Sequence, residues 1–138
     1  VYDLVEHRPV SVERDGSVLR IPVDLEPGGG RLWLITEKAV GGVHIQAPAE
    51  AVRGEDLPVS ITVADDAGAP LNAVVPLEVV IRDPDGRRAE FSGYYGARDG
   101  LLTLTITPAP NDVPGMWTLE ARELASGIVT RHYFRLPA

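Results

Sequence analysis

The sequence predicts an all-β protein in which antiparallel sheets pack as a sandwich. Three observations lead to this fold class. Apolar residues alternate with polar ones at a period of two in most windows, and no window shows the apolar spacing of an amphipathic helix. Turn signals such as Asp-Gly separate the alternating runs. The chain has 138 residues, which suits one ordinary domain or two very small ones.

The alternation predicts about ten strands. Its clearest example is the stretch 57–63, in which Leu, Val, Ile and Val occupy every second position and Pro, Ser and Thr lie between them. The stretches 19–25 and 75–81 show the same period. The expected strands cover residues 9–14, 17–25, 31–36, 42–47, 57–64, 74–82, 88–95, 101–107, 115–123 and 127–136.

Tight turns are expected between these strands. Asp or Ser followed by Gly occurs at residues 15–16, 85–86, 99–100 and 126–127. Gly adopts positive φ at little cost, and the polar residue can bond its own backbone, so each pair predicts a chain reversal. Residues Pro27–Gly30 are expected to form a flexible tip that joins two N-terminal strands.

The chain divides into two parts near residues 38–42, which have the composition of a linker or crossover. Residues 43–138 have the length of one immunoglobulin-like β-sandwich. Residues 1–40, which we call the N-terminal extension, hold only about three strands, too few for an independent core. We expect this β-hairpin extension to pack on the sandwich or to form the edge of a preceding domain.

Composition excludes several classes of function. The net charge of −7 repels phosphate backbones and anionic headgroups, so no nucleic-acid partner is expected. The chain has no Cys, which excludes thiolate catalysis, disulfides and Cys-based metal sites. No stretch approaches the ~20 apolar residues of a membrane helix, so no membrane insertion is expected. No signal peptide is visible and the chain begins at Val1, which indicates a processed or excised piece of a longer protein.

The N-terminal extension resembles the closing β-hairpins of bacterial glycoside-hydrolase-type chains. The resemblance covers residues 2–36 and depends on the stretches Tyr2–Leu4, Val10–Val12 and Leu25–Trp33. It implies that these strands lie at the C-terminal edge of such a chain.

Residues 43–136 resemble bacterial immunoglobulin-like modules of the macroglobulin-repeat type. The matching stretches are Leu57–Val63, Pro76–Gly86, Asp99–Leu104 and Pro114–Ala121. The last is the most specific, because a Gly followed by an aromatic residue and an alternating run opens a late strand in these folds. The resemblance implies a spacer, scaffold or binding module in a larger extracytoplasmic protein. It does not imply the thioester activity of full macroglobulins, which needs a Cys.

No residue is predicted to be catalytic, and no metal or cofactor site is predicted. The three histidines, His7, His44 and His132, belong to no ligand motif, and no nucleophile signature such as G-x-S-x-G is present. The twenty Asp and Glu residues permit no assignment of a catalytic pair. Asp65–Asp66 and Asp83–Gly86 place carboxylates close together, which leaves calcium binding open, although turn formation is the favoured explanation.

Three aromatic residues are the candidate ligand-binding residues. Tyr94 and Tyr95 are adjacent between two glycines, so on a strand their rings should point to opposite sides. Together with Trp33 they are the side chains that would stack on a sugar ring if they are exposed. Trp117 begins an alternating apolar run and is expected in the core.

The leading functional hypothesis is a non-catalytic accessory or interaction module of a larger bacterial extracytoplasmic protein. It would act as a spacer, a scaffold or a protein-docking domain. Its partners would be neighbouring domains of the parent chain or another protein, which could dock along an exposed edge strand. The alternative is a carbohydrate-binding module of a glycoside-hydrolase-type protein, with polysaccharide as the ligand. A third hypothesis is a fragment of a glycoside hydrolase itself, although fold alone never establishes such an activity.

Overall fold

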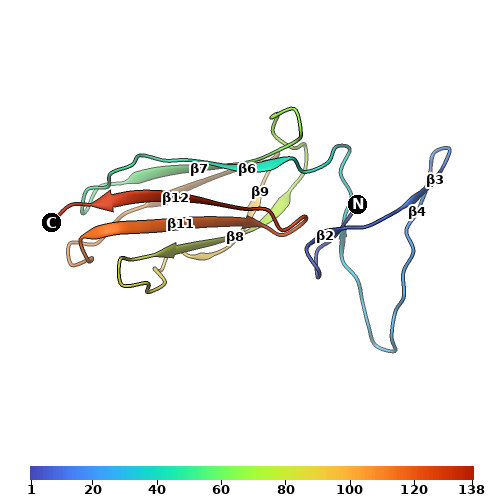
Figure 1. Cartoon of the computed structure of the whole chain (residues 1–138), viewed down its shortest axis with the longest axis horizontal. Helices are drawn as coiled ribbons and strands as arrows, with labels where there is room; N and C mark the ends of the chain where they lie inside the picture. The colour runs from blue at the N-terminus through green and yellow to red at the C-terminus, as the bar shows by residue number, and fades with distance from the viewer.

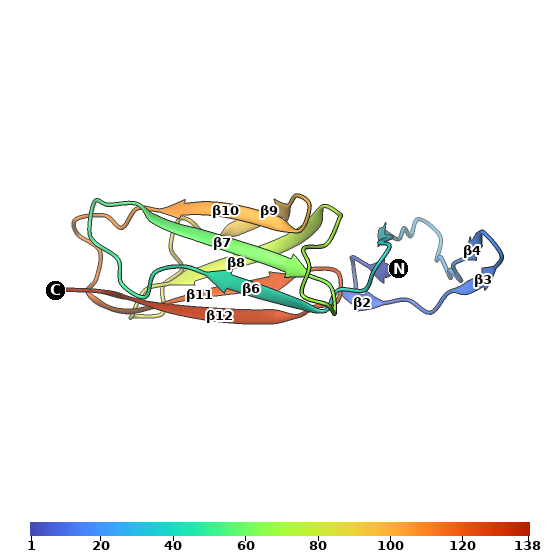
Figure 2. The ribbon, with the colours of Figure 1, turned by 90° about the horizontal axis from the view of Figure 1, so that it is seen from above.

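Two antiparallel sheets form most of the molecule. The computed structural model describes all 138 residues and contains no helix. One sheet has the order β10-β7-β6 and the other has the order β12-β11-β8-β9. The strands are β6 (Gly42–Gln46), β7 (Leu57–Ala64), β8 (Val75–Arg82), β9 (Gly93–Ala97), β10 (Leu101–Ile106), β11 (Gly115–Glu123) and β12 (Val129–Leu136). Figures 1 and 2 show the sheets as two facing layers, which confirms the predicted immunoglobulin-like sandwich.

The core lies between the sheets and follows from the period of two. In β7 and β8 every second side chain is buried, whereas the alternate side chains, except Ala64 at the end of β7, are less buried or exposed. On the third long strand, Trp117 is buried and its ring centroid lies 5.9 Å from that of Phe134 in β12, with the rings stacked. The prediction that Trp117 belongs to the core is therefore confirmed.

The N-terminal extension forms two small sheets. β1 (Tyr2–Asp3), β2 (Arg8–Pro9) and β5 (Trp33–Leu34) form a sheet of order β2-β1-β5, and β3 (Glu13–Asp15) pairs with β4 (Val18–Arg20). The extension projects from the end of the sandwich that lies opposite the C-terminus (Figures 1 and 2). No strand of the extension pairs with a strand of the sandwich.

The predictions of long strands in the extension are wrong. The expected strand 17–25 is reduced to the three residues of β4, and the expected strand 31–36 is reduced to the two residues of β5. The expected strand 9–14 is split between β2 and β3. The side chains of Val23 and Leu25 alternate as predicted but are about half exposed, at 50% and 52%. No second layer covers them, so the alternation has no buried face to stabilise it.

Two further predictions need correction. Residues Pro27–Gly30 do form a turn, in which the Gly29 N–H donates to the Glu26 carbonyl, but the strands on either side do not pair with each other. β4 pairs with β3, and β5 pairs with β1. The expected strand 88–95 begins only at Gly93, because the Ser92 hydroxyl bonds both the N–H and the carbonyl of Ile81 where a strand residue would otherwise pair.

The extension is joined to the end of the sandwich by a small set of contacts. The N–H of Val40 donates to the Tyr2 hydroxyl at 2.7 Å, and both residues are buried. The His7 ring nitrogen Nδ1 lies 2.7 Å from the carbonyl of Leu124, in the turn between β11 and β12. Gly127 of that turn has a φ of +83°, and a Cβ there would lie 3.1 Å from the His7 carbonyl oxygen. We call these contacts, together with the ion pair between Lys38 and Asp65, the junction.

Candidate functional site

The two candidate tyrosines lie on β9 and point to opposite sides of the sheet. Tyr94 is on the outer face and is 74% exposed. Tyr95 points toward the core and is half-buried, and its hydroxyl donates to the Phe91 carbonyl at 2.7 Å. Only Tyr94 therefore presents its ring to solvent, and Tyr95 serves the packing of the loop before β9.

Trp33 lies elsewhere, on β5 of the extension. Its half-buried side chain lines a hollow of about 350 Å³ that contains neither tyrosine. Two strands and the loop around residues 22–24 form the other walls. The charged residues that line the hollow are Asp3, Glu6, Arg8, Asp24 and Arg31. The three predicted ligand-binding residues are therefore not brought together into one site.

Hydrogen bonds and ion pairs hold the charged groups of this hollow in place. The buried Asp3 carboxylate accepts hydrogen bonds from the N–H groups of Val5 and Glu6, at 2.8 and 3.1 Å. The Glu6 carboxylate forms ion pairs with Arg8 at 2.5 Å and with Arg31 at 3.3 Å. These bonds orient planar charged groups beside the Trp33 ring.

The pKa of Asp3 is lowered. Burial alone would raise it, but the hydrogen bonds from Glu6 and Val5 and the nearby charge of Arg31 outweigh the burial. A carboxyl with a lowered pKa is unsuited to act as the general acid of glycoside hydrolysis, which needs a raised pKa.

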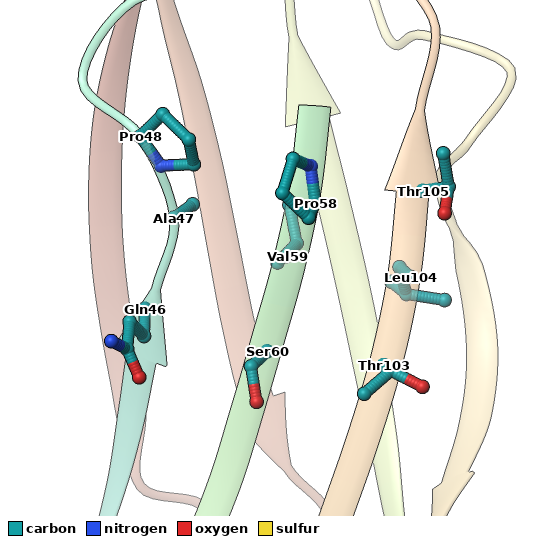
Figure 3. Close-up of a pocket in the computed structure, with 9 residues that line it drawn as sticks. All are labelled: Gln46, Ala47, Pro48, Pro58, Val59, Ser60, Thr103, Leu104 and Thr105. Atoms are coloured by element: carbon teal, nitrogen blue, oxygen red, sulfur yellow. The ribbon is translucent and has the colours of Figure 1, made fainter. Parts of the chain in front are cut away.

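A second hollow, a groove of about 520 Å³, crosses the three-stranded sheet (Figure 3). Its origin lies in two prolines. The β6–β7 register pairs Gln46 with Ser60, so its continuation would place Pro48 opposite Pro58. The N–H of Val63 bonds Gly100 on the β10 side, so the backbone groups of Ser60 and Pro58 face β6. Two facing prolines have no N–H to donate, and the ladder ends there.

After Pro48 the chain leaves the β10-β7-β6 sheet, and residues 49–51 bond β12 of the facing sheet. The N–H of Arg135 donates to the Ala49 carbonyl at 2.8 Å, and the N–H of Ala51 donates to the Arg135 carbonyl at 2.9 Å. The crossing leaves β7 uncovered beside the prolines, where the groove opens. Its polar side chains are uncharged and are those of Gln46, Ser60, Thr103 and Thr105. Such a groove can form hydrogen bonds but contains no general acid or base.

The acidic turns have structural roles. The buried Asp65 carboxylate accepts hydrogen bonds from the N–H groups of Ala67 and Ala69 and from Lys38 Nζ, the last at 2.6 Å. The bond to Lys38 is the main cause of the lowered pKa of Asp65, and it raises the pKa of Lys38. Asp83 accepts a hydrogen bond from the N–H of Arg87. No group of three or more His, Asp or Glu side chains is placed to hold a metal ion.

The most exposed apolar segment of the molecule was not predicted from the sequence. Six large apolar side chains of the extension are at least half exposed: Val5, Val18, Val23, Leu25, Leu32 and Ile35. The remaining seven exposed large apolar residues are spread over the 98 residues that follow. The sequence carried a signal only at Val23 and Leu25, which alternate as buried strand residues do, but alternation does not say what covers them.

No protein-family model matches the sequence, and no curated protein matches it. Among solved structures, the superoxide reductase (neelaredoxin) of Ignicoccus hospitalis has a TM-score of 0.54 at 13% identity, over 70% of this chain and 81% of that one. A CARDB domain of Pyrococcus furiosus has a TM-score of 0.49 at 15% identity, over 70% and 91%. A β-glucosidase of Listeria innocua has a TM-score of 0.46 at 14% identity, over 80% of this chain and 17% of that one. At these identities the likeness is one of fold.

The structure also has no helix of the length and apolarity needed to span a membrane.

Proposed function

We propose that this protein is a non-catalytic interaction module of a larger bacterial extracytoplasmic protein, and that the extension docks on a neighbouring domain or on another protein. The observation that supports this function is the exposure of apolar side chains along residues 5–35. The sandwich has its own core, whereas most of the extension lies outside it. Exposed apolar residues in such number are typical of surfaces that a partner covers.

Site-specific photo-crosslinking in the native host tests this proposal. A benzophenone side chain would replace Val23, Leu25 or Ile35 of the extension, and in a control it would replace Leu101, which is 45% exposed on the outer face of β10. The expected result is one discrete adduct, within the parent chain or with one polypeptide, from the extension positions alone. Adducts of equal yield at Leu101, or none at the extension, would contradict the proposal.

The second candidate function is carbohydrate binding, and the hollow beside Trp33 favours it. Sugar rings stack on aromatic faces, and planar charged groups exchange paired hydrogen bonds with sugar hydroxyls. The lining holds three acidic and two basic residues, a near balance that suits a neutral ligand better than a charged one. Tyr94 and Tyr95 lie outside this hollow and would not contribute.

Tryptophan fluorescence separates this candidate from the first. The chain has two Trp residues, and Trp117 is buried in the core, so a change in emission on titration with xylan, laminarin or chitin oligosaccharides would come from Trp33. Trp33→Ala should abolish binding, and Tyr94→Ala should leave it unchanged. If none of these sugars gives a saturable change, or if Trp33→Ala binds as well as the parent protein, carbohydrate binding at this hollow is wrong.

A further inference from the structure

The outer faces of the two sheets differ sharply in charge. On the β10-β7-β6 sheet the outward positions carry no charged side chain, and their central residues are Gln46, Ser60 and Thr103, which lie side by side in register. On the β12-β11-β8-β9 sheet the outward positions carry four arginines and two glutamates. These six residues are Arg82, Arg122, Arg131, Arg135, Glu78 and Glu120.

This second face is basic in an acidic protein. Residues 41–138 contain eight arginines and thirteen acidic residues, and outside this face they carry four arginines against eleven acids. Half of the arginines of the sandwich are therefore on one sheet face. We call the whole outer face of the β12-β11-β8-β9 sheet, including the exposed side chains that lie between these arginines, the arginine face.

Most arginines of the arginine face have no carboxylate partner. Arg131 forms an ion pair with Glu120 at 2.6 Å, but Arg122 and Arg135 form none. Arg122 lies directly opposite Glu78 in the register and still makes no ion pair with it. Arg82 donates to the Gly86 carbonyl instead. Three guanidinium groups thus lack a carboxylate partner and can pair with carboxylates of another molecule.

Aromatic and sulfur-containing side chains lie among these arginines. Tyr94 pairs with Glu78, and Tyr133 pairs with Thr118, next to Arg82 in the same row. Met116 pairs with Arg135. Tyr94, Tyr133 and Met116 are 74%, 54% and 55% exposed. Tyr, Met and Arg are the residue types enriched in protein–protein interfaces, whereas Lys, which is depleted there, does not occur on this face.

We propose that the arginine face binds an acidic polypeptide segment, with the free arginines pairing its carboxylates and the tyrosines packing against its side chains. This inference extends the proposed interaction function to a second surface, separate from the extension. The negative charge of the whole molecule argues against a nucleic acid, because a long polyanion would meet repulsion outside this face. A short acidic segment fits within the face and avoids that repulsion.

Fluorescence anisotropy with two labelled peptides tests the proposal on the full chain. One probe alternates Glu and Tyr, and the other alternates Lys and Tyr. The Glu-Tyr probe should bind at low salt and lose affinity as NaCl rises, because exposed charge pairs are screened. The Lys-Tyr probe should bind more weakly. Tighter binding of the Lys-Tyr probe, or no binding of the Glu-Tyr probe at low salt, would overturn the proposal.

Matched charge reversals separate the arginine face from the overall charge. Arg122→Glu combined with Arg135→Glu should weaken Glu-Tyr binding about tenfold or more. Arg14→Glu combined with Arg98→Glu changes the net charge equally, at exposed positions that form no ion pair, and should change affinity less than about twofold. Equal weakening by both double variants would contradict a local site.

Two further outcomes complete the test. Arg122→Lys combined with Arg135→Lys keeps the charge and should retain more binding than the reversal, which shows that the loss comes from the charge at these positions. If a DNA duplex binds, and its affinity falls in the Arg122→Glu and Arg135→Glu double variant as that of the Glu-Tyr probe does, the ligand of this face is a nucleic acid and the proposal is overturned. Because the crosslinking test uses no position on the arginine face, failure of either proposal leaves the other testable.

Discussion

The sandwich and the extension show what the same sequence pattern does with and without a second layer. Strand β8 and the stretch 17–25 both alternate apolar and polar residues. In β8 the apolar residues are buried against the facing sheet, whereas Val23 and Leu25 are about half exposed. Alternation therefore becomes a long strand only where another surface covers its apolar side.

The two tryptophans offer the sharpest test, because each region has one. Trp117→Ala removes a buried ring that stacks on Phe134 and should lower the free energy of unfolding by about 3–5 kcal/mol. Trp33→Ala removes a half-buried ring of the extension and should cost less than about 1 kcal/mol. Urea denaturation followed by circular dichroism measures both. Equal losses would mean that the extension has a core of its own.

Glu123 should be the next largest contributor, at the sandwich end that meets the extension. Its buried carboxylate accepts hydrogen bonds from the N–H groups of Ala125, Ser126 and Ile128 and from the Ser126 hydroxyl. Glu123→Ala would leave these donors without partners and should cost about 2–3 kcal/mol by urea denaturation. Glu78→Ala, at an outward position of β8, is the control and should stay within about 0.5 kcal/mol.

Gly127→Ala should loosen the junction. The substitution places a Cβ at positive φ and near the His7 carbonyl, and should cost about 1–2 kcal/mol. Gly54→Ala is the matched control, because Gly54 also has positive φ, +76°, but no atom lies within 4 Å of its added Cβ. Amide hydrogen exchange of residues 2–9 should increase in Gly127→Ala and stay unchanged in Gly54→Ala. If both variants leave exchange in the extension unchanged, the His7 contact does not anchor it.

The junction should also respond to pH. The lowered pKa of Asp65 contributes stability that is present above about pH 4 and is lost as pH falls through the lowered value. The raised pKa of Lys38 contributes stability that is present below about pH 10 and is lost as pH rises through the raised value. Hydrogen exchange at residues 36–40, after correction for the intrinsic rate, should be slowest between about pH 4 and pH 10 and should speed up outside this range.

Asp65→Asn removes the group responsible for most of this dependence, and Asp66→Asn is the control, because Asp66 is exposed and makes no ion pair. The acid-induced increase in exchange at residues 36–40, after correction for the intrinsic rate, should be much smaller in Asp65→Asn. An unchanged pH profile in that variant would show that the Lys38–Asp65 pair does not hold the junction.

The smallest effect is expected from the apolar residues of the extension itself. Val23→Ser and Leu25→Ser should change the free energy of unfolding by less than about 0.5 kcal/mol, because both side chains are already half exposed. Leu77→Ser, which places a hydroxyl in the core, should cost several kcal/mol. A large loss from Val23→Ser would show that another surface covers this side chain, such as that of a second copy in a dimer.

The sequence predicts the sandwich well and the extension poorly, for one physical reason. The burial of Trp117 and of the apolar residues of β7 follows from their spacing at every second position. Both sheets that enclose the core belong to this chain, so each apolar side has a surface to pack against. The strands around Val23 are short because no second layer faces them, and the local sequence pattern does not encode whether such a layer is present. The Pro48–Pro58 groove needed the β6–β7 register, which is a long-range property.

The candidate ligand-binding residues divide in the same way. The opposite orientations of Tyr94 and Tyr95 follow from strand geometry alone. The charged hollow around Trp33 could not be predicted, because it brings Asp3 and Arg31 together across paired strands. The arginine face likewise becomes visible only when the register aligns residues of four strands, although each arginine was evident in the sequence.

Amide hydrogen exchange of the intact chain, measured by mass spectrometry, tests whether a second layer covers the extension. We expect the amides of β7, β8 and β11 to be protected to nearly the full free energy of unfolding, while residues 10–32 exchange close to their unprotected rates. We also expect binding of a partner to protect residues 10–32 specifically. Protection of residues 10–32 in the isolated chain equal to that of β8 would contradict the claim that the extension lacks a covering surface.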